Sequence, residues 1–160
     1  MSDAKCLLVG TGTLECNIGC GLLGWSINSI TLIDSGVVRF SHTVKQCPYT
    51  YEGAKTWTKE KTGAAVERLR EIDPNIVAAG YDLHHPIGET VRARTEQDLD
   101  KFVEVVQSHD VVFMLTDSKE SRWLSTLLGT FCGKIVINAA FGFGRYLITR
   151  HRTRSRVLEA

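Results

Sequence analysis

A glycine pair and three charged side chains suggest that this chain binds an anionic ligand. Gly10 and Gly12 follow one short apolar run, Asp34 ends the next, and Lys61 and Asp117 come later. Glycines let the backbone N–H groups of a turn approach a phosphate closely, and a lysine neutralises its charge. A carboxylate accepts hydrogen bonds from sugar hydroxyls or binds a hard cation such as Mg²⁺. These residue types favour a phosphorylated ligand with a metal ion.

Each of these residues also has a structural explanation, and the sequence leaves both explanations open. The glycine pair fits a tight packing turn, and Asp34 can cap a strand end, although its distance from the turn is that of a ribose-binding acid. Lys61 can be a solvated surface lysine, but near a helix start it opposes the helix dipole unless an anion neutralises it. Asp117 can cap a helix beside Ser118.

Alternating apolar segments are expected to position these residues. Strands are predicted at residues 6–9, 29–33, 76–80, 111–115 and 134–138. Helices are predicted from residue 14, over residues 58–72, from Thr95 in a capping box with Asp98, and from Ser118. This pattern predicts an α/β fold, a doubly wound, mostly parallel sheet with helices on both faces, as in Rossmann-like nucleotide-binding domains. Gly10, Asp34, Leu83 and Asp117 all fall at its carboxyl edge, and residues 35–57 form a long loop.

Length and composition suit one globular domain. The chain has 160 residues, 43% of them hydrophobic, and a formal net charge of only +1, which gives no reason to expect a nucleic-acid partner. No apolar run is long enough to span a membrane, and no signal peptide is recognised. The five cysteines form no C-x-x-C pair, so a reducing, cytoplasmic location is expected. Cys16 and Cys20 share a predicted helix face, where apolar packing is expected rather than metal binding.

The same residues carry a family resemblance. Asp34, the segment SHTVKQ at residues 41–46, Lys61, and Asp117 followed five residues later by Arg122 resemble the adenylation domain of ubiquitin-activating-type (ThiF/MoeB-like) enzymes. Within that family, the strings SRW, SHDVVF and VINAAFGF look closest to the autophagy branch. The likeness covers nearly the whole chain. It implies an adenylation-type ATP-binding domain over residues 1–151, followed by a basic, solvated tail over residues 152–160.

The resemblance implies a reaction and its partners. ATP and Mg²⁺ would be the ligands, and a ubiquitin-like autophagy modifier would supply a C-terminal glycine carboxylate that attacks the α-phosphate. The product would be an acyl-adenylate, which such enzymes normally transfer to their own cysteine. A homodimer or an activating-enzyme partner subunit is the expected assembly.

The resemblance also implies roles for individual residues. Asp34 would hold the ribose hydroxyls, and Asp117 would take the Mg²⁺. The glycine turn of Gly10 and Gly12 would lie in the nucleotide site, together with His42. The residues expected to reach the phosphates are Lys45, Gln46 and Lys61, and backbone around Leu83 would lie against adenine.

Three residues depart from the family pattern at this site. Glu15 replaces the third glycine of the loop, His42 replaces an asparagine, and Lys45 replaces an arginine. The third glycine normally permits close packing of helix and strand, so Glu15 is expected to point outward or to push the helix away. Lys45 lacks the planar two-pronged donor of arginine. ATP is therefore expected to bind less tightly than in relatives.

The cysteines also depart from the pattern, because none matches the catalytic nucleophile of the family. Cys132, the nearest candidate, precedes a predicted strand and is expected to be structural. The leading hypothesis is therefore an adenylation domain that lacks the catalytic-cysteine segment. The alternative is a non-catalytic binding module or partner subunit, and the third hypothesis is an NAD-dependent oxidoreductase.

Overall fold

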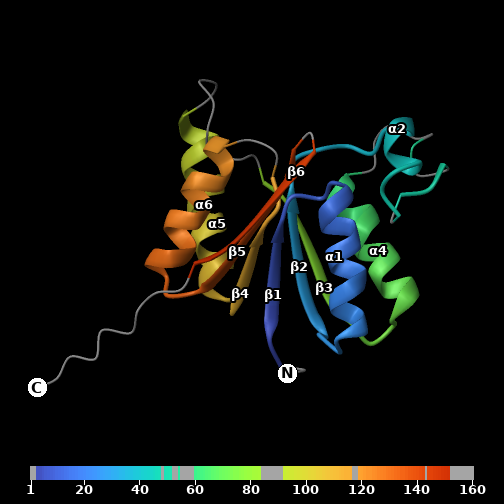
Figure 1. Cartoon of the computed structure of the whole chain (residues 1–160), viewed down its shortest axis with the longest axis horizontal. Helices are drawn as coiled ribbons and strands as arrows, with labels where there is room; N and C mark the ends of the chain where they lie inside the picture. Colours follow the sequence, from blue (N-terminus) through green and yellow to red (C-terminus); the bar gives the residue numbers. More distant parts are fainter. Residues whose placement is uncertain are drawn as a thin grey trace, which may run out of the picture.

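The chain folds around one six-stranded sheet with the strand order β3-β2-β1-β4-β5-β6 (Figure 1). The computed structural model describes residues 3–47, 49–51, 54, 60–83, 92–116, 119–142 and 144–151. The five parallel strands are β1 (Lys5–Val9), β2 (Ser29–Asp34), β3 (Val77–Asp82), β4 (Val111–Met114) and β5 (Ile135–Gly142). The last strand, β6 (Arg145–His151), runs antiparallel to β5. The predicted doubly wound, mostly parallel sheet is confirmed.

Helices cover both faces of the sheet (Figure 1). Helices α1 (Thr13–Gly24) and α4 (Lys61–Ile72) lie on one face, and α5 (Arg92–Gln107) and α6 (Lys119–Phe131) lie on the other. The four-residue helix α2 (Phe40–Thr43) lies beyond the carboxyl edge of the strands. None of the helices in the described part of the chain combines the length and apolar character that crossing a bilayer requires.

The central strand β1 divides the core into two layers. Leu8 packs in the layer shared with α1 and α4, whereas Leu7 and Val9 pack in the layer shared with α5. Successive side chains of a strand point to opposite faces, so an apolar run buried on both sides is what a central parallel strand requires. The strand order reverses between β1 and β4, and ligands of such sheets bind outside the carboxyl ends at this point.

Two helices begin where the sequence pattern did not place them. Helix α4 begins at Lys61, and Glu60 forms an antiparallel bridge with Val37 instead of joining the helix, so the predicted start at residue 58 is wrong. Helix α5 already includes Arg92, so Thr95 lies inside it and the predicted capping box there is wrong. Arginine and alanine are good helix formers, which explains how residues 92–94 extend the helix.

The end of the sheet also differs from the prediction. Strand β5 continues to Gly142, four residues beyond its predicted end, and β6 was not predicted at all. Arg150, for which no element was predicted, lies in β6. Residues 152–160 lie outside the described residues.

The two ends of the predicted loop between β2 and α4 lie next to each other beside the sheet. Besides the bridge between Val37 and Glu60, the backbone N–H of Lys61 donates to the carbonyl of Gly36 at 3.0 Å. The loop holds α2, and three of its apolar residues are buried in the α1–α4 core layer. These residues are Val38, Tyr49 and Ala54. The segment is therefore part of the core as well as of the carboxyl edge.

Candidate functional site

The glycine turn after β1 is tied to the end of β2. Gly10 has φ +111°, a conformation that side chains rarely allow, and its N–H donates to the carbonyl of Ile33 at 2.8 Å. Thr11 donates twice to Asp34 Oδ2, from its backbone N at 2.8 Å and from its hydroxyl at 2.6 Å. The turn and Asp34 therefore meet at the carboxyl edge, as the sequence predicts.

Asp34 is partly engaged by the protein itself. Its other oxygen, Oδ1, accepts the N–H of Gly36 at 2.6 Å. Each carboxylate oxygen has two lone pairs, so these three bonds leave acceptor capacity on Oδ1. Asp34 thus caps the turn at the end of β2, as expected if its role is structural. Its Oδ1 atom can still accept a hydrogen bond from one ligand hydroxyl.

Glu15 points into the glycine turn, so the expectation that it points outward is wrong. Its side chain is only 5% exposed. A Cβ at Gly12 would lie 3.0 Å from Glu15 Oε2, and a Cβ at Gly10 would collide with Glu15 Oε1. The two glycines leave a hollow at the start of α1, where the helix dipole favours negative charge. The carboxylate of Glu15 lies in the hollow that an external anion would use.

Lys61 lies beside Asp34 because Gly36 lacks a side chain. A Cβ at Gly36 would be 2.9 Å from Asp34 Oδ1 and 3.1 Å from Lys61 Cδ, so the two side chains flank the same glycine. Lys61 is the first residue of α4, where its charge opposes the helix dipole. The structure therefore brings the predicted phosphate lysine and the predicted ribose acid to one place.

The loop after β2 brings His42 near this pair. Burial, together with the positive charges of Lys61 and Arg39, lowers the pKa of His42, and Asp34 opposes this shift. His42 Nδ1 accepts the backbone N–H of Arg39 at 3.1 Å, which makes His42 a capping residue of α2. The Nδ1 atom of the imidazole is therefore occupied by a hydrogen bond within the protein.

Lys45 and Gln46 follow in the same loop. Lys45 is exposed, whereas the Oε1 atom of Gln46 is buried and has no hydrogen-bond partner among the described residues. A buried polar atom without a partner indicates that a hydrogen-bonding group, such as water or part of a ligand, belongs there.

Tyr49 anchors the loop, because its hydroxyl donates to the carbonyl of Thr11 at 2.9 Å. Burial raises the pKa of Tyr49, which remains a neutral donor.

Two further predicted residues belong to neighbouring strand ends. Leu83 directly follows β3 and packs against the α5 core layer. Asp117 and Ser118, which lie between Thr116 and α6 in the sequence, are outside the described residues. The nearness of Asp117 to the glycine turn therefore stays a prediction from the strand order.

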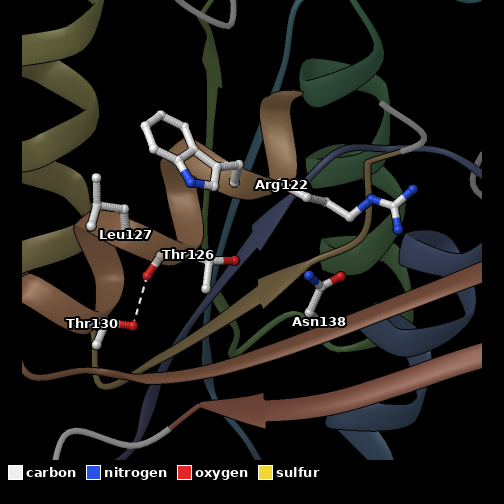
Figure 2. Close-up of a pocket in the computed structure, with 6 residues that line it drawn as sticks. Arg122, Thr126, Leu127, Thr130 and Asn138 are labelled. Carbon is white, nitrogen blue, oxygen red and sulfur yellow. Dashed lines mark hydrogen bonds between the residues drawn. The ribbon is translucent and has the colours of Figure 1, made fainter. Parts of the chain in front are cut away.

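A pocket of about 470 Å³ lies between α6 and β5 (Figure 2). Arg122 and Trp123 line it from α6, and Asn138 lines it from β5. Asn138 Oδ1 is buried and has no partner among the described residues. Asn138 was not predicted as a site residue, although an asparagine within the apolar run VINAA was a signal for such a role. Tyr49 was missed as well, and an isolated tyrosine in an irregular loop offers no comparable signal.

The strand order and the glycine turn at its reversal define a Rossmann-type α/β domain. A family model described as "ThiF family" matches residues 1–159, so the chain belongs to the ThiF family. It is 44% identical over 156 residues to the ubiquitin-like modifier-activating enzyme ATG7 of Sordaria macrospora, which covers 94% of the chain. The corresponding enzyme of Rattus norvegicus is 38% identical over 156 residues and covers 93% of the chain. The chain spans 22% of the length of each.

Solved structures share the fold. E. coli MccB with ATP superposes with a TM-score of 0.77, covering 96% of this chain and 42% of MccB, at 17% sequence identity. SeMet PaaA superposes with a TM-score of 0.69 over 86% of this chain and 38% of PaaA, at 16% identity. At these identities the likeness concerns the fold alone.

Proposed function

We propose that the chain is the ATP-binding adenylation domain of an enzyme that activates a ubiquitin-like autophagy modifier. The observation that carries the proposal is that the glycine turn at the reversal of the strand order is bonded to Asp34, and that Asp34 and Lys61 flank Gly36. Similarity to enzymes named for activating ubiquitin-like modifiers supports the choice of substrate. A nicotinamide cofactor would leave Lys61 unused, because backbone N–H groups at a helix N-terminus suffice to bind its pyrophosphate.

The proposed chemistry needs alignment and charge neutralisation. The C-terminal carboxylate of the modifier is ionised at neutral pH, so no protein group has to remove a proton. One of its oxygens forms a bond to the α-phosphorus of ATP, while the bond from that phosphorus to the departing pyrophosphate breaks. Lys61 and the exposed Lys45 would offset the negative charge of the phosphates, and Asp34 would orient the ribose.

Magnesium would be held with few protein ligands. Asp117, after β4, offers a hard carboxylate oxygen of the kind that Mg²⁺ prefers. No group of three His, Cys, Asp or Glu side chains among the described residues could hold an ion alone. This fits an ion bound by one carboxylate, water and phosphate oxygens, and its charge would stabilise the leaving pyrophosphate.

A second candidate function is a non-catalytic binding module that keeps the fold. One observation favours it, namely that the Glu15 carboxylate lies over both glycines of the turn. A phosphate would have to displace this carboxylate or bind beside it. The two candidates differ in whether the chain binds Mg-ATP.

Calorimetry with Mg-ATP and with NAD tests the proposal. We expect weak binding of Mg-ATP, no binding of NAD, and loss of affinity in Asp117→Ala only when Mg²⁺ is present. Asp100, exposed on α5, provides the matched control Asp100→Ala, which should bind as the parent does. Equal affinities of the parent and Asp117→Ala, with and without Mg²⁺, would make Asp117 a helix cap only. Absence of any ATP binding would favour the binding module.

A surface of apolar side chains on β6 and α6 is the proposed contact with a second copy of the chain. Strand β6 ends the described sheet, and three consecutive residues of it, Tyr146, Leu147 and Ile148, are exposed. Trp123, Leu127 and Phe131 are exposed along α6. Large exposed apolar side chains often mark a contact between proteins, and an edge strand invites pairing.

A further inference from the structure

Two cysteines far apart in the sequence lie close together beside the candidate site. Cys20 belongs to α1, Cys47 belongs to the loop after α2, and their sulfur atoms are 3.9 Å apart. Cys47 is exposed and Cys20 is half-buried, so small reagents can reach the pair. Cys6 and Cys16 are buried, and Cys132 packs against the opposite core layer.

The surrounding contacts keep the two sulfur atoms near each other. On one side, α1 is fixed against α4, where the buried Gly19 faces Leu69. On the other side, the backbone N–H of Tyr49 donates to Gln46 at 3.0 Å, and its hydroxyl reaches Thr11. A disulfide requires the sulfurs to approach to about 2.05 Å. The exposed turn that holds Cys47 can make this small movement without a change in α1.

We propose that Cys20 and Cys47 form a reversible disulfide under peroxide, which fastens the loop of Lys45 and Gln46 to α1. The thiolate of Cys47 attacks one oxygen of hydrogen peroxide, the O–O bond breaks, and a sulfenic acid and hydroxide result. This hydroxide takes up the proton that the Cys47 thiol released and becomes water. The thiolate of Cys20 then attacks this sulfur, forming the S–S bond and expelling hydroxide, which becomes water. Two thiols and one peroxide thus give one disulfide and two waters.

The two cysteines have different parts in this sequence. Burial raises the pKa of Cys20, and the neighbouring Cys47 raises it further, against the opposing charge of Arg68. Cys20 is therefore a poor first nucleophile but is correctly placed to attack an oxidised Cys47. In a reducing compartment such a bond would be transient, as is usual for redox-sensing disulfides.

The bond would restrict the loop that is expected to reach the phosphates. Lys45 precedes Cys47 by two residues and is exposed, so it is a site for trypsin. Cleavage in a loop requires local opening, which a covalent tie to α1 opposes. We expect cleavage after Lys45 to slow about tenfold in the oxidised chain and to recover in dithiothreitol. This expectation stands whether or not ATP binds.

Peptide mapping tests the proposal directly. The 160-residue chain is treated with hydrogen peroxide, blocked with an alkylating reagent and digested to completion with trypsin without reduction. The expected product joins the peptides of residues 6–39 and 46–55, lighter by two hydrogens than their sum, and dithiothreitol separates them. Fragmentation assigns the bond to Cys20, because residues 6–39 also contain Cys6 and Cys16.

Matched variants complete the test. Cys20→Ser and Cys47→Ser should each abolish the linked product and the slower cleavage, whereas Cys132→Ser should keep both. The proposal is overturned if peroxide leaves residues 46–55 unlinked, as a free thiol or a sulfinic acid, or joins them to another chain. Since no step involves a nucleotide, this outcome is independent of the ATP titrations.

Discussion

At the scale of single residues, Glu15 decides how the glycine turn behaves. A loop of this kind normally offers backbone N–H groups and a helix N-terminus to an external phosphate. Here a buried carboxylate lies over both glycines. The Glu15 carboxylate therefore supplies the negative charge that the N-terminus of α1 favours. The phosphate of a nucleotide would have to compete with this carboxylate.

Removing this carboxylate should strengthen ATP binding. In Glu15→Gly we expect the affinity for ATP to rise about tenfold, because the variant removes a negative charge and opens the hollow over Gly10 and Gly12. Calorimetric titration at low and high salt measures the effect, which should shrink with salt if charge dominates.

Glu15→Gln is the matched variant, because it removes the charge and keeps the volume. We expect it to lie between the parent and Glu15→Gly. If Glu15→Gly binds ATP more weakly than the parent, the carboxylate organises the turn for the nucleotide instead of competing with it.

At the scale of elements, His109 joins the end of α5 to β2. Its Nδ1 lies 2.6 Å from the carbonyl of Val105, which makes Nδ1 the donor, and its Nε2 lies 2.7 Å from the hydroxyl of Thr31. Burial lowers the pKa of His109, against the opposing bond to Val105. Lys5 and Lys134 lower it further, and Asp110 raises it. The folded state therefore keeps a neutral imidazole here.

The stability of the fold should consequently depend on pH through His109. Because its folded pKa is below the usual value, its contribution is complete above about pH 6.5 and is lost as the pH falls toward the folded pKa. Urea unfolding at several pH values measures this slope. His109→Gln should cost about 1 kcal/mol at pH 7 and flatten the slope below pH 6.5. An unchanged slope in this variant would assign the acid sensitivity to other groups.

The central elements could be predicted from the sequence, and the peripheral ones could not. Strands β1 and β2 are buried on both faces and β4 is at least half-buried on both, so their apolar runs identify them. Strand β6 is an exposed edge strand in which Arg145 and Arg150 flank a run of only four other residues, and such a strand is easily taken for a loop or a tail. The direction of Glu15 was also beyond prediction, because it depends on the hollow that the folded turn creates.

At the scale of the whole molecule, the apolar surface on β6 and α6 should govern self-association. We expect sedimentation velocity to show a concentration-dependent dimer that Ile148→Asp weakens, because a charge buried in an interface has no partner there. Val44, exposed in the loop near the candidate site, provides the matched control Val44→Asp, which should dimerise as the parent does. A parent that stays monomeric at all concentrations would contradict the proposed dimer.

In this chain the proposed reaction should stop after adenylation, before thioester formation. With Mg-ATP and an autophagy modifier, we expect exchange of labelled pyrophosphate into ATP but no reducible thioester. Adenylation needs aligned reactants, whereas thioester formation needs a reactive thiolate beside the acyl carbon. Cys132, half-buried after α6, is the residue to control for. A modifier adduct that disappears with dithiothreitol and in Cys132→Ser would show that this chain carries its own nucleophile.

A ligand that binds to the segment between Val37 and Glu60 should change the melting temperature of the whole molecule. The ends of this segment are joined at the sheet, and Val38, Tyr49 and Ala54 fill part of the core, so the segment cannot loosen without weakening the whole fold. A compound that contacts Lys45 or Gln46 holds this segment in place and thereby raises the melting temperature. A thermal-shift screen of metabolites should therefore find ligands of the carboxyl edge without any knowledge of the reaction.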